Sequence, residues 1–321
     1  MQTQLMKVDP LLCDFEMPLR ATFYPLGFPL QIRTNSHEVL AAAEESWGRF
    51  PKLFSTPPLQ MQIGVLEGGP AECPAFPVCR EQRGLRSLVA DAENFGVSDL
   101  KQGFAFAWFT RAAVKSTAYL RWHFIEGMAW GLLDTYITPV HAACVRFAGR
   151  GFLLCGDSGA GKSSLSFACA KSGWTFLSDD SSSLVRMRPE PAVIGNPHQF
   201  RFRESAMALF PELKRQQPTP RYTGELAIEL PTASMPEITI TNECAVDYIV
   251  FLDRGHSGSP RILPFPKQKA LQWFEQVICC GDMPAHKAAL RTLLNTQIFE
   301  MRYGDLASAV NCLEDLARRG A

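Results

Sequence analysis

The chain has 321 residues, with 32 basic and 32 acidic side chains that give a formal net charge of zero. Its 46% hydrophobic and 20% charged content is typical of a globular protein with one large domain or two smaller ones. Because zero net charge supplies no global basic field, we expect no nucleic-acid partner. No stretch of about 18 apolar residues predicts a membrane span, and the first residues lack a signal-peptide pattern. We therefore expect a cytoplasmic protein without a membrane partner.

Ten cysteines are present, and their placement favours buried free thiols. Cys144, Cys155 and Cys169 lie in apolar runs, where a thiol behaves as a small hydrophobic group. Cys73 and Cys79 flank a proline-rich stretch, but no second pair follows at zinc-ligand spacing. A metal site or a disulfide is the alternative, and free thiols agree with a reducing cytoplasm.

The first 138 residues alternate between strand-like and helix-like patterns. The expected elements in chain order are two short strands within 20–35, a helix over 36–50, a strand over 59–67, a loop over 68–86, paired strands at 87–94 and 103–110, and a helix over 118–137. Ser36 is the expected N-cap of the first helix. This mixture predicts an α+β domain over residues 1–138.

A second domain is expected over residues 139–321. Its predicted elements are two strands joined at 148–151, a glycine-rich turn, a helix to about residue 172, strands at 174–178, 182–188, 191–195 and 246–254, and helices at 266–280, 284–295 and 304–319. Residues 212–245, rich in Pro, Thr and Glu, are left unassigned. Strands alternating with helices predict an α/β fold.

The turn "GDSGAGKS" fits the P-loop pattern G-x-x-x-x-G-K-[ST], with a buried-looking strand before it and a helix after it. Its glycines let successive amides point inward, and these amides with the helix N-terminus form an anion site. Lys162 can reach the β and γ phosphates of ATP, and the Ser163 hydroxyl can bind Mg²⁺. The predicted nucleotide-binding residues are Gly156, Asp157, Ser158, Gly159, Ala160, Gly161, Lys162, Ser163 and Ser164.

Two acids follow the next apolar strand, at Asp179 and Asp180. If that strand lies parallel and next to the strand before the P-loop, the C-terminal ends of the two strands meet near the loop. One carboxylate could then hold Mg²⁺ and the other could accept a proton as a general base. A solvated turn is the alternative reading of Asp-Asp-Ser-Ser-Ser. His141 opens the strand before the one that feeds the loop, and by spacing alone it also fits a core histidine with one hydrogen bond.

Residues 139–185 resemble the catalytic core of the HPr kinase/phosphorylase superfamily. The shared pattern is a histidine followed by a small residue, two strands, G-D-S-G-x-G-K-S, a helix ending in glycine, and a strand ending in Asp-Asp. The resemblance implies a P-loop kinase core of the HPr-kinase/PEP-carboxykinase type, preceded here by an α+β N-terminal domain. It covers 139–185 well and the rest of 139–321 loosely.

The resemblance also implies roles. Lys162 would bind the phosphates and Ser163 the magnesium. Asp180 would deprotonate the acceptor hydroxyl, with Asp179 as its companion on the side of the metal. His141 would lie beside the transferring phosphoryl group. Enzymes of this family phosphorylate a serine on a small carrier protein, and some reverse the reaction. Relatives act on other hydroxyls, including a serine of small modified peptides. The N-terminal domain is the expected place for acceptor recognition.

The chain departs from the family where Glu-Ile-Arg-Gly is expected. If Gln199 to Arg201 occupy that place, Gln199 replaces an acidic magnesium ligand, which puts the reverse reaction and recognition of the carrier protein in doubt. Arg201, Arg203 and Arg254 are candidate contacts for phosphate or acceptor, with Arg221 as a weaker one. A solvated edge strand is the alternative for the first two.

The sequence predicts a kinase that uses ATP and Mg²⁺ and transfers phosphate to a hydroxyl of a protein, a peptide or a small molecule. A nucleotide-binding regulatory protein without catalysis is one alternative, which the paired carboxylates disfavour. A nucleoside-triphosphate hydrolase is another, which the lack of a recognisable arginine finger disfavours. A homo-oligomer is possible.

Overall fold

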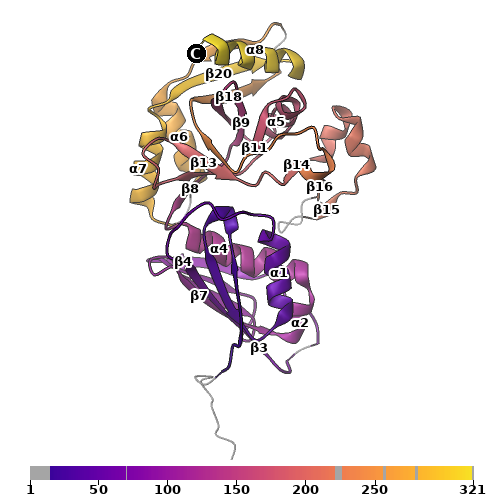
Figure 1. Ribbon diagram of the computed structural model, residues 1–321, viewed down its shortest axis with the longest axis vertical. Helices are drawn as coiled ribbons and strands as arrows, with labels where there is room; N and C mark the ends of the chain where they lie inside the picture. Colours follow the sequence, from indigo (N-terminus) through magenta and orange to yellow (C-terminus); the bar gives the residue numbers. More distant parts are fainter. Residues whose placement is uncertain (1–14, 70, 221–225, 256–257, 279–280, 320–321) are drawn as a thin grey trace, which may run out of the picture. The chain divides into compact units, whose positions relative to one another are not determined.

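The computed structural model describes residues 15–69, 71–220, 226–255, 258–278 and 281–319 (Figure 1). The chain forms two compact units, Met1–Leu133 and Asp134–Ala321. The boundary lies a few residues before the expected one at 138/139. Strand β8 (Ile137–Val140) pairs with β12 (Ser182–Val185), and this antiparallel pairing makes residues 137–140 part of the second unit.

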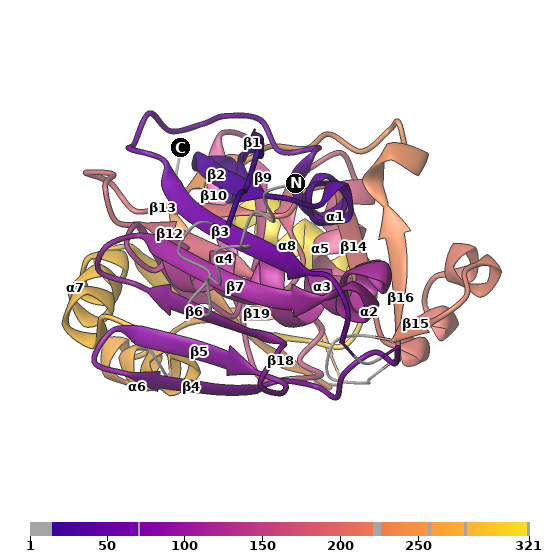
Figure 2. The same cartoon turned by 90° about the horizontal axis from the view of Figure 1, so that it is seen from below.

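A seven-stranded mixed sheet forms the centre of the first unit. Its order is β1-β2-β3-β7-β6-β5-β4, with β2, β3 and β7 parallel and the other pairs antiparallel (Figure 2). The strands are β1 (Leu19–Phe23), β2 (Leu30–Thr34), β3 (Leu59–Leu66), β4 (Val78–Gln82), β5 (Leu85–Val89), β6 (Phe95–Asp99) and β7 (Phe104–Thr110).

Helices pack on one face of this sheet. They are α1 (His37–Trp47), α2 (Arg111–Lys115), α3 (Thr117–Leu120), a π-helical turn (Arg121–Ile125) and α4 (Glu126–Leu133). Along β3 and β7 every second side chain is buried, including Met61, Ile63, Ala105 and Phe109, as expected for a strand with one face on the core. α1 contacts β1 and β2 while α4 contacts β5, β6 and β7, so both helices cover this core face.

Two predictions for this unit are wrong. Residues 68–86 are not all loop, because β4 and the start of β5 lie there, and the strand at 87–94 does not pair with the one at 103–110, because β6 lies between them. The β4–β5 hairpin turns at Arg83 and Gly84, which both have positive φ angles of 54° and 86°. This is the backbone of a two-residue hairpin turn, but Arg-Gly lacks the usual Asn-Gly or Asp-Gly signature.

A six-stranded sheet, in the order β11-β9-β10-β18-β20-β19, forms the centre of the second unit. Its strands are β9 (Ala143–Phe147), β10 (Arg150–Cys155), β11 (Thr175–Ser178), β18 (Tyr248–Arg254), β19 (Arg261–Pro264) and β20 (Gln297–Tyr303). The main helices are α5 (Lys162–Lys171), α6 (Lys267–Val277), α7 (Met283–Leu293) and α8 (Leu306–Arg319). This mixed α/β architecture agrees with the expected fold class, although β8, β19 and β20 were not predicted.

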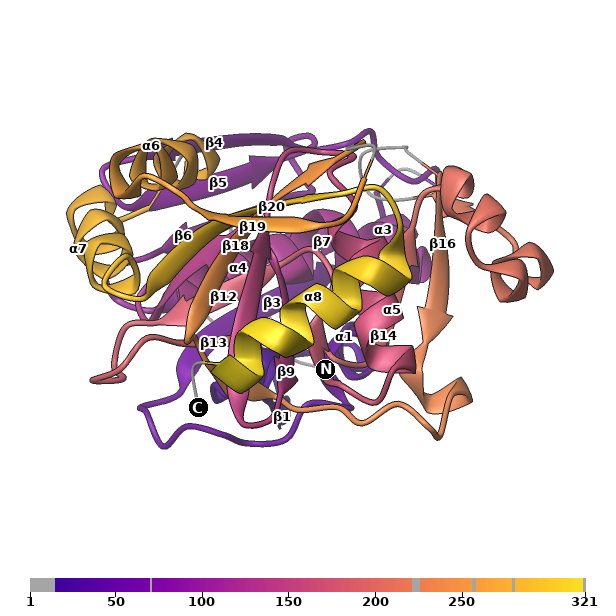
Figure 3. The same ribbon diagram turned by 90° about the horizontal axis from the view of Figure 1, so that it is seen from above.

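Both faces of this sheet are covered. Phe152 and Leu154 of β10 join a core cluster with residues of α5 and α8, which pack together (Figure 3), whereas Leu153 and Cys155 join a second cluster with residues of α6 and α7. Two smaller sheets complete the unit, β17-β13-β12-β8 and β14-β16-β15. Their remaining strands are β13 (Ala192–Gly195), β14 (Gln199–Phe202), β15 (Thr219–Pro220), β16 (Leu226–Pro231) and β17 (Glu243–Ala245).

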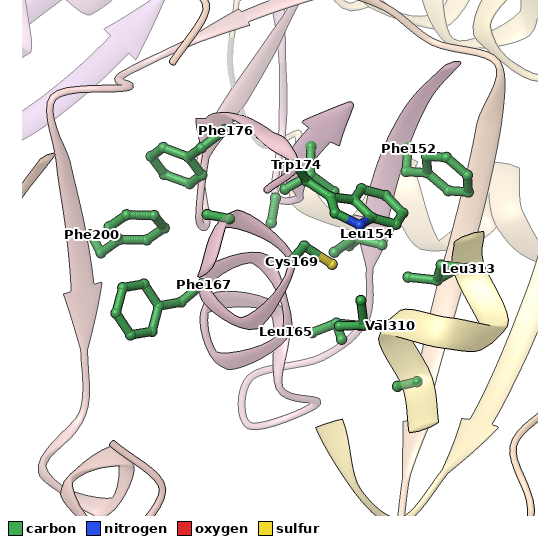
Figure 4. Close-up of a cluster of buried hydrophobic side chains, with 14 of the residues drawn as sticks. Phe152, Leu154, Leu165, Phe167, Cys169, Trp174, Phe176, Phe200, Val310 and Leu313 are labelled. Atoms are coloured by element: carbon green, nitrogen blue, oxygen red, sulfur yellow. The ribbon is translucent and has the colours of Figure 1, made fainter. Parts of the chain in front are cut away.

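Aromatic side chains anchor helix α5 to its surroundings (Figure 4). Phe167 of α5 packs edge-to-face on Phe200 of β14, with ring centres 4.9 Å apart, and Phe200 stacks on Phe176 of β11 at 3.9 Å. Trp174 is fully buried beside Phe152. Edge-to-face and offset-stacked pairs stabilise beyond the area they bury, so these contacts hold the middle of α5 against β14.

Strand β11, which Asp179 follows directly, is not the neighbour of β10, the strand that leads into the glycine-rich turn. β9 lies between them, antiparallel to both β11 and β10. Because β9 is antiparallel to both strands, β10 and β11 run in the same direction and end at the same edge of the sheet. β9 begins at that edge, which places His141 there as well. In the part of the chain that the structure describes, no helix is long and apolar enough to cross a bilayer.

Candidate active site

The glycine loop, Gly156–Ser163, connects the end of β10 to the start of α5. Gly161 has a φ angle of 97°, and a Cβ atom there would lie only 2.5 Å from the Tyr303 hydroxyl oxygen. Gly156 has a φ angle of 147°, and its Cβ would meet the Cβ of Ala160 at 2.8 Å. Both positions therefore require glycine. The loop runs into the N-terminus of α5, where unpaired amides and the helix dipole favour an anion.

Lys162 folds back over the glycine loop. Its ammonium group donates to the carbonyl oxygen of Gly156 at 2.8 Å and lies 3.2 Å from Nε2 of His141. The side chain is only 5% exposed. Burial lowers the pKa of Lys162, and the nearby Asp180 carboxylate opposes this shift. The loop thus carries a buried amine beside the backbone amides at the N-terminus of α5.

The carboxylate of Asp180 faces this amine. Its Oδ1 lies 3.7 Å from Nζ of Lys162 and 3.5 Å from Nε2 of His141. The Asp180 side chain is 35% exposed, so a molecule arriving from solvent can reach it. The structure thus brings an acid, a histidine and a lysine together at the loop, from the end of β11, the start of β9 and the start of α5.

Asp179 points elsewhere. Its Oδ2 accepts a hydrogen bond of 2.6 Å from the backbone N–H of Arg201, and the residue is only 7% exposed. Burial raises the pKa of Asp179 to about 7, with the Arg201 N–H as the main opposing influence. The Ser163 hydroxyl donates to the backbone oxygen of Asp179 at 3.4 Å. Asp179 therefore ties the end of β11 to β14.

The residues at the loop suit a cation that is shared with phosphate oxygens. Among the described residues, no cluster of three or more His, Cys, Asp or Glu side chains could hold a metal by itself. Mg²⁺ is commonly bound by one or two carboxylates, water and the phosphates of a substrate. The half-buried hydroxyl of Ser163 supplies a donor of this kind, and Asp179 contributes a backbone oxygen beside it.

The three candidate arginines take different positions. Arg203 donates to the hydroxyl of Ser158 in the loop at 2.6 Å. Arg254 lies beside Gly161, with its Cδ 3.7 Å from the position that a Cβ there would take. The guanidinium group of Arg201 is engaged by Glu229 at 3.0 Å. Two of the three cations thus border the loop, and Arg221 falls outside the described residues.

Two further side chains hold the loop from outside. The Trp273 indole N–H on α6 donates to the carboxylate of Asp157 at 2.9 Å, and the Tyr303 hydroxyl on β20 donates to the carbonyl oxygen of Ala160 at 3.1 Å. Burial raises the pKa of Tyr303 to about 12. Sequence reasoning missed both residues, because no local pattern marks a side chain that contacts a loop more than a hundred positions earlier.

Comparisons with known proteins add little to this geometry. No family model matches the chain, and no curated protein matches it either. One similar solved structure is the Hpr(Ser) kinase/phosphatase from Coxiella burnetii, with 14% sequence identity and a TM-score of 0.30 over 57% of this chain and 95% of that one. A likeness of this size carries no argument about activity. Membership of the HPr kinase/phosphorylase superfamily therefore stays a prediction.

Proposed function

We propose that the chain is an ATP-dependent phosphotransferase that passes the γ-phosphoryl group to a hydroxyl group. The observation that carries this proposal is the position of Asp180, whose carboxylate lies 3.7 Å from the buried ammonium of Lys162 at the glycine loop and is open to solvent. A base placed beside an anion-binding loop is what proton removal from an acceptor hydroxyl requires.

The loop and its neighbours suit a triphosphate. The amides of the P-loop and the N-terminus of α5 would bind phosphate oxygens. The ammonium of Lys162, which donates to the Gly156 carbonyl, would turn to the β and γ phosphates. Arg203 and Arg254, which border the loop, would add positive charge. Magnesium, bound with the nucleotide, would neutralise charge on the phosphate oxygens.

The residues of the chain then have distinct tasks. The oxygen of the acceptor hydroxyl would form a bond to the γ-phosphorus while Asp180 accepts the proton of that hydroxyl. The bond from the γ-phosphorus to the β–γ bridging oxygen would break at the same time. The electron pair of the broken bond leaves with ADP, and the phosphate ester is the second product. Lys162 would stabilise the negative charge of the transferring group. His141, 3.5 Å from Asp180, would hold that carboxylate in place.

Transfer from γ-labelled ATP tests this function. ADP and label would be followed with Mg²⁺, with and without serine-containing peptides or small alcohols. The proposal expects ADP formation that depends on an acceptor, with the label on that acceptor. Equal turnover without acceptor would instead show a hydrolase, and nucleotide binding without turnover for any acceptor would show a regulatory module. Either of these outcomes would overturn the proposal.

Lys162→Met should weaken ATP binding by tenfold or more, on the order of the effect of a lost charge-assisted hydrogen bond. Lys171→Met is the matched control, because Lys171 lies on the same helix but is exposed and paired with Glu212. Titration calorimetry with ATP and Mg²⁺ measures both affinities. Equal affinities for the two variants would contradict nucleotide binding at the glycine loop.

Trp273→Phe should weaken ATP binding by about tenfold. The indole N–H holds the Asp157 carboxylate at 2.9 Å, and without it this negative charge is free to approach the phosphates. Adding Asp157→Asn to Trp273→Phe removes the charge and should restore most of the affinity in the same titration. If the double variant binds ATP as weakly as the single one, the indole acts by packing and not by restraining Asp157.

A further inference from the structure

A hollow with a volume of about 410 Å³ lies in the first unit, on the face of the seven-stranded sheet opposite the helices. This volume falls within the range of small-molecule sites. Its floor is formed by side chains of β3 and β7, which are Gln62, Phe104, Phe106 and Trp108. The hollow belongs entirely to the first unit and therefore involves none of the residues of the glycine loop.

The floor is built by strand register. Arg33, Gln62 and Phe106 are paired in sequence across β2, β3 and β7, so their side chains form one row on the same face. Beside this row the Trp108 ring packs against Gly64, where a Cβ atom would come within 2.1 Å of the indole. Only glycine at this position lets the ring lie against the strand.

The segment of residues 15–17, which precedes β1, forms one wall of the hollow. β1 and β7 are three strand spacings apart, roughly 14 Å, yet Phe15, which precedes β1, packs edge-to-face on Trp108 with ring centres 4.9 Å apart. Residues 15–17 must therefore leave the line of β1 and pass over β2 and β3. Phe15 and Met17 both line the hollow, which makes it a pocket between the sheet and this crossing segment.

The lining of the pocket includes one basic side chain, that of Arg33. Arg33 has no carboxylate partner within the described residues. The register places Arg20 of β1 directly opposite Arg33, and within the described residues Arg20 donates to the neutral amide of Gln31. Like charges directly opposite in a sheet are destabilising, so a bound anion would relieve this repulsion.

We propose that this pocket binds a small, flat aromatic anion, such as an aromatic carboxylate or sulfonate. Its ring would stack on Trp108 and Phe106, and residue Phe106 is 37% exposed. Its anionic group would bind the guanidinium of Arg33, with the Gln62 amide beside it. This site is independent of the phosphotransferase function proposed above.

Naphthalene-2-sulfonate is a suitable probe, added to the full chain in phosphate buffer so that phosphate competes at other anion sites. Binding is followed through the indole N–H resonance of Trp108, assigned with Trp108→Phe. The expected result is saturable binding that shifts this resonance. Naphthalen-2-ylmethylammonium, with the same rings and the opposite charge, should bind at least tenfold more weakly.

Arg33→Gln should weaken sulfonate binding by about tenfold, the loss expected for one charge-assisted hydrogen bond. Arg80→Gln is the matched control, because Arg80 is an exposed arginine on the far edge strand β4 and should leave the affinity unchanged. An unmoved Trp108 resonance, equal affinities for the two probes, or equal losses in the two arginine variants would each overturn the proposal. Thermal unfolding of both variants checks that their folding is intact.

Discussion

Replacing Asp180 by asparagine is expected to lower the rate of phosphoryl transfer by about 10²- to 10⁴-fold. The amide has nearly the same shape as the carboxylate but cannot accept the proton of the acceptor hydroxyl. Asp180 lies beside Lys162 and is not one of the groups proposed to bind the phosphates. The affinity for ATP should therefore change only a few-fold. Single-turnover transfer from γ-labelled ATP gives the rate, and calorimetry gives the affinity.

Asp315→Asn provides the control for this experiment, because Asp315 is an exposed acid on α8 that pairs with Arg318 and Arg319 of the same helix. It should leave both the rate and the affinity unchanged. Two results would count against a general base at Asp180. One is transfer at the wild-type rate in Asp180→Asn, and the other is a loss that lies wholly in ATP affinity.

The stability of the fold should depend on pH through Asp179. Burial raises the pKa of this acid from 3.8 to about 7, so the folded state holds its proton more tightly than the unfolded state. The neutral acid stabilises the fold fully below about pH 4, and this contribution is lost as the pH rises to and through 7. A difference of this size corresponds to on the order of 4 kcal/mol.

Asp179→Asn keeps an oxygen that can accept from the Arg201 N–H, and it has no proton to lose. Its free energy of unfolding should therefore rise relative to wild type between about pH 4 and pH 8, by up to about 4 kcal/mol. Urea unfolding at several pH values measures the difference. Asp315→Asn should show none, and a constant difference between Asp179→Asn and wild type would contradict a raised pKa.

The loop and its immediate flanks could be read from the sequence because their structure is local. Glycine at positions 156, 159 and 161 is demanded by the backbone itself, since all three have positive φ angles. The strand before the loop and the helix after it follow from apolar runs of a few residues. Short-range patterns of this kind also predicted α6, α7 and α8 close to their observed bounds.

The meeting of the Asp179-Asp180 pair with the glycine loop was expected for a reason that the structure corrects. The prediction assumed adjacent parallel strands, whereas β9 lies between β10 and β11. The expected edge of the sheet was nevertheless right, since two antiparallel pairings leave β10 and β11 pointing the same way.

The residues around positions 156–163 were enough to predict a glycine-rich loop between a strand and a helix, because glycine conformation and apolar periodicity act over a few residues. Other features became visible in the three-dimensional structure alone. Asp179 is buried against β14, and Arg203 borders the loop while Arg201 pairs with Glu229. Trp273 of α6 and Tyr303 of β20 hold the loop in place. The tertiary structure also decided the pocket on the first sheet, where the wall comes from a segment crossing two strands. These contacts join residues far apart in the chain, and pairing between distant strands leaves no periodic trace in the sequence.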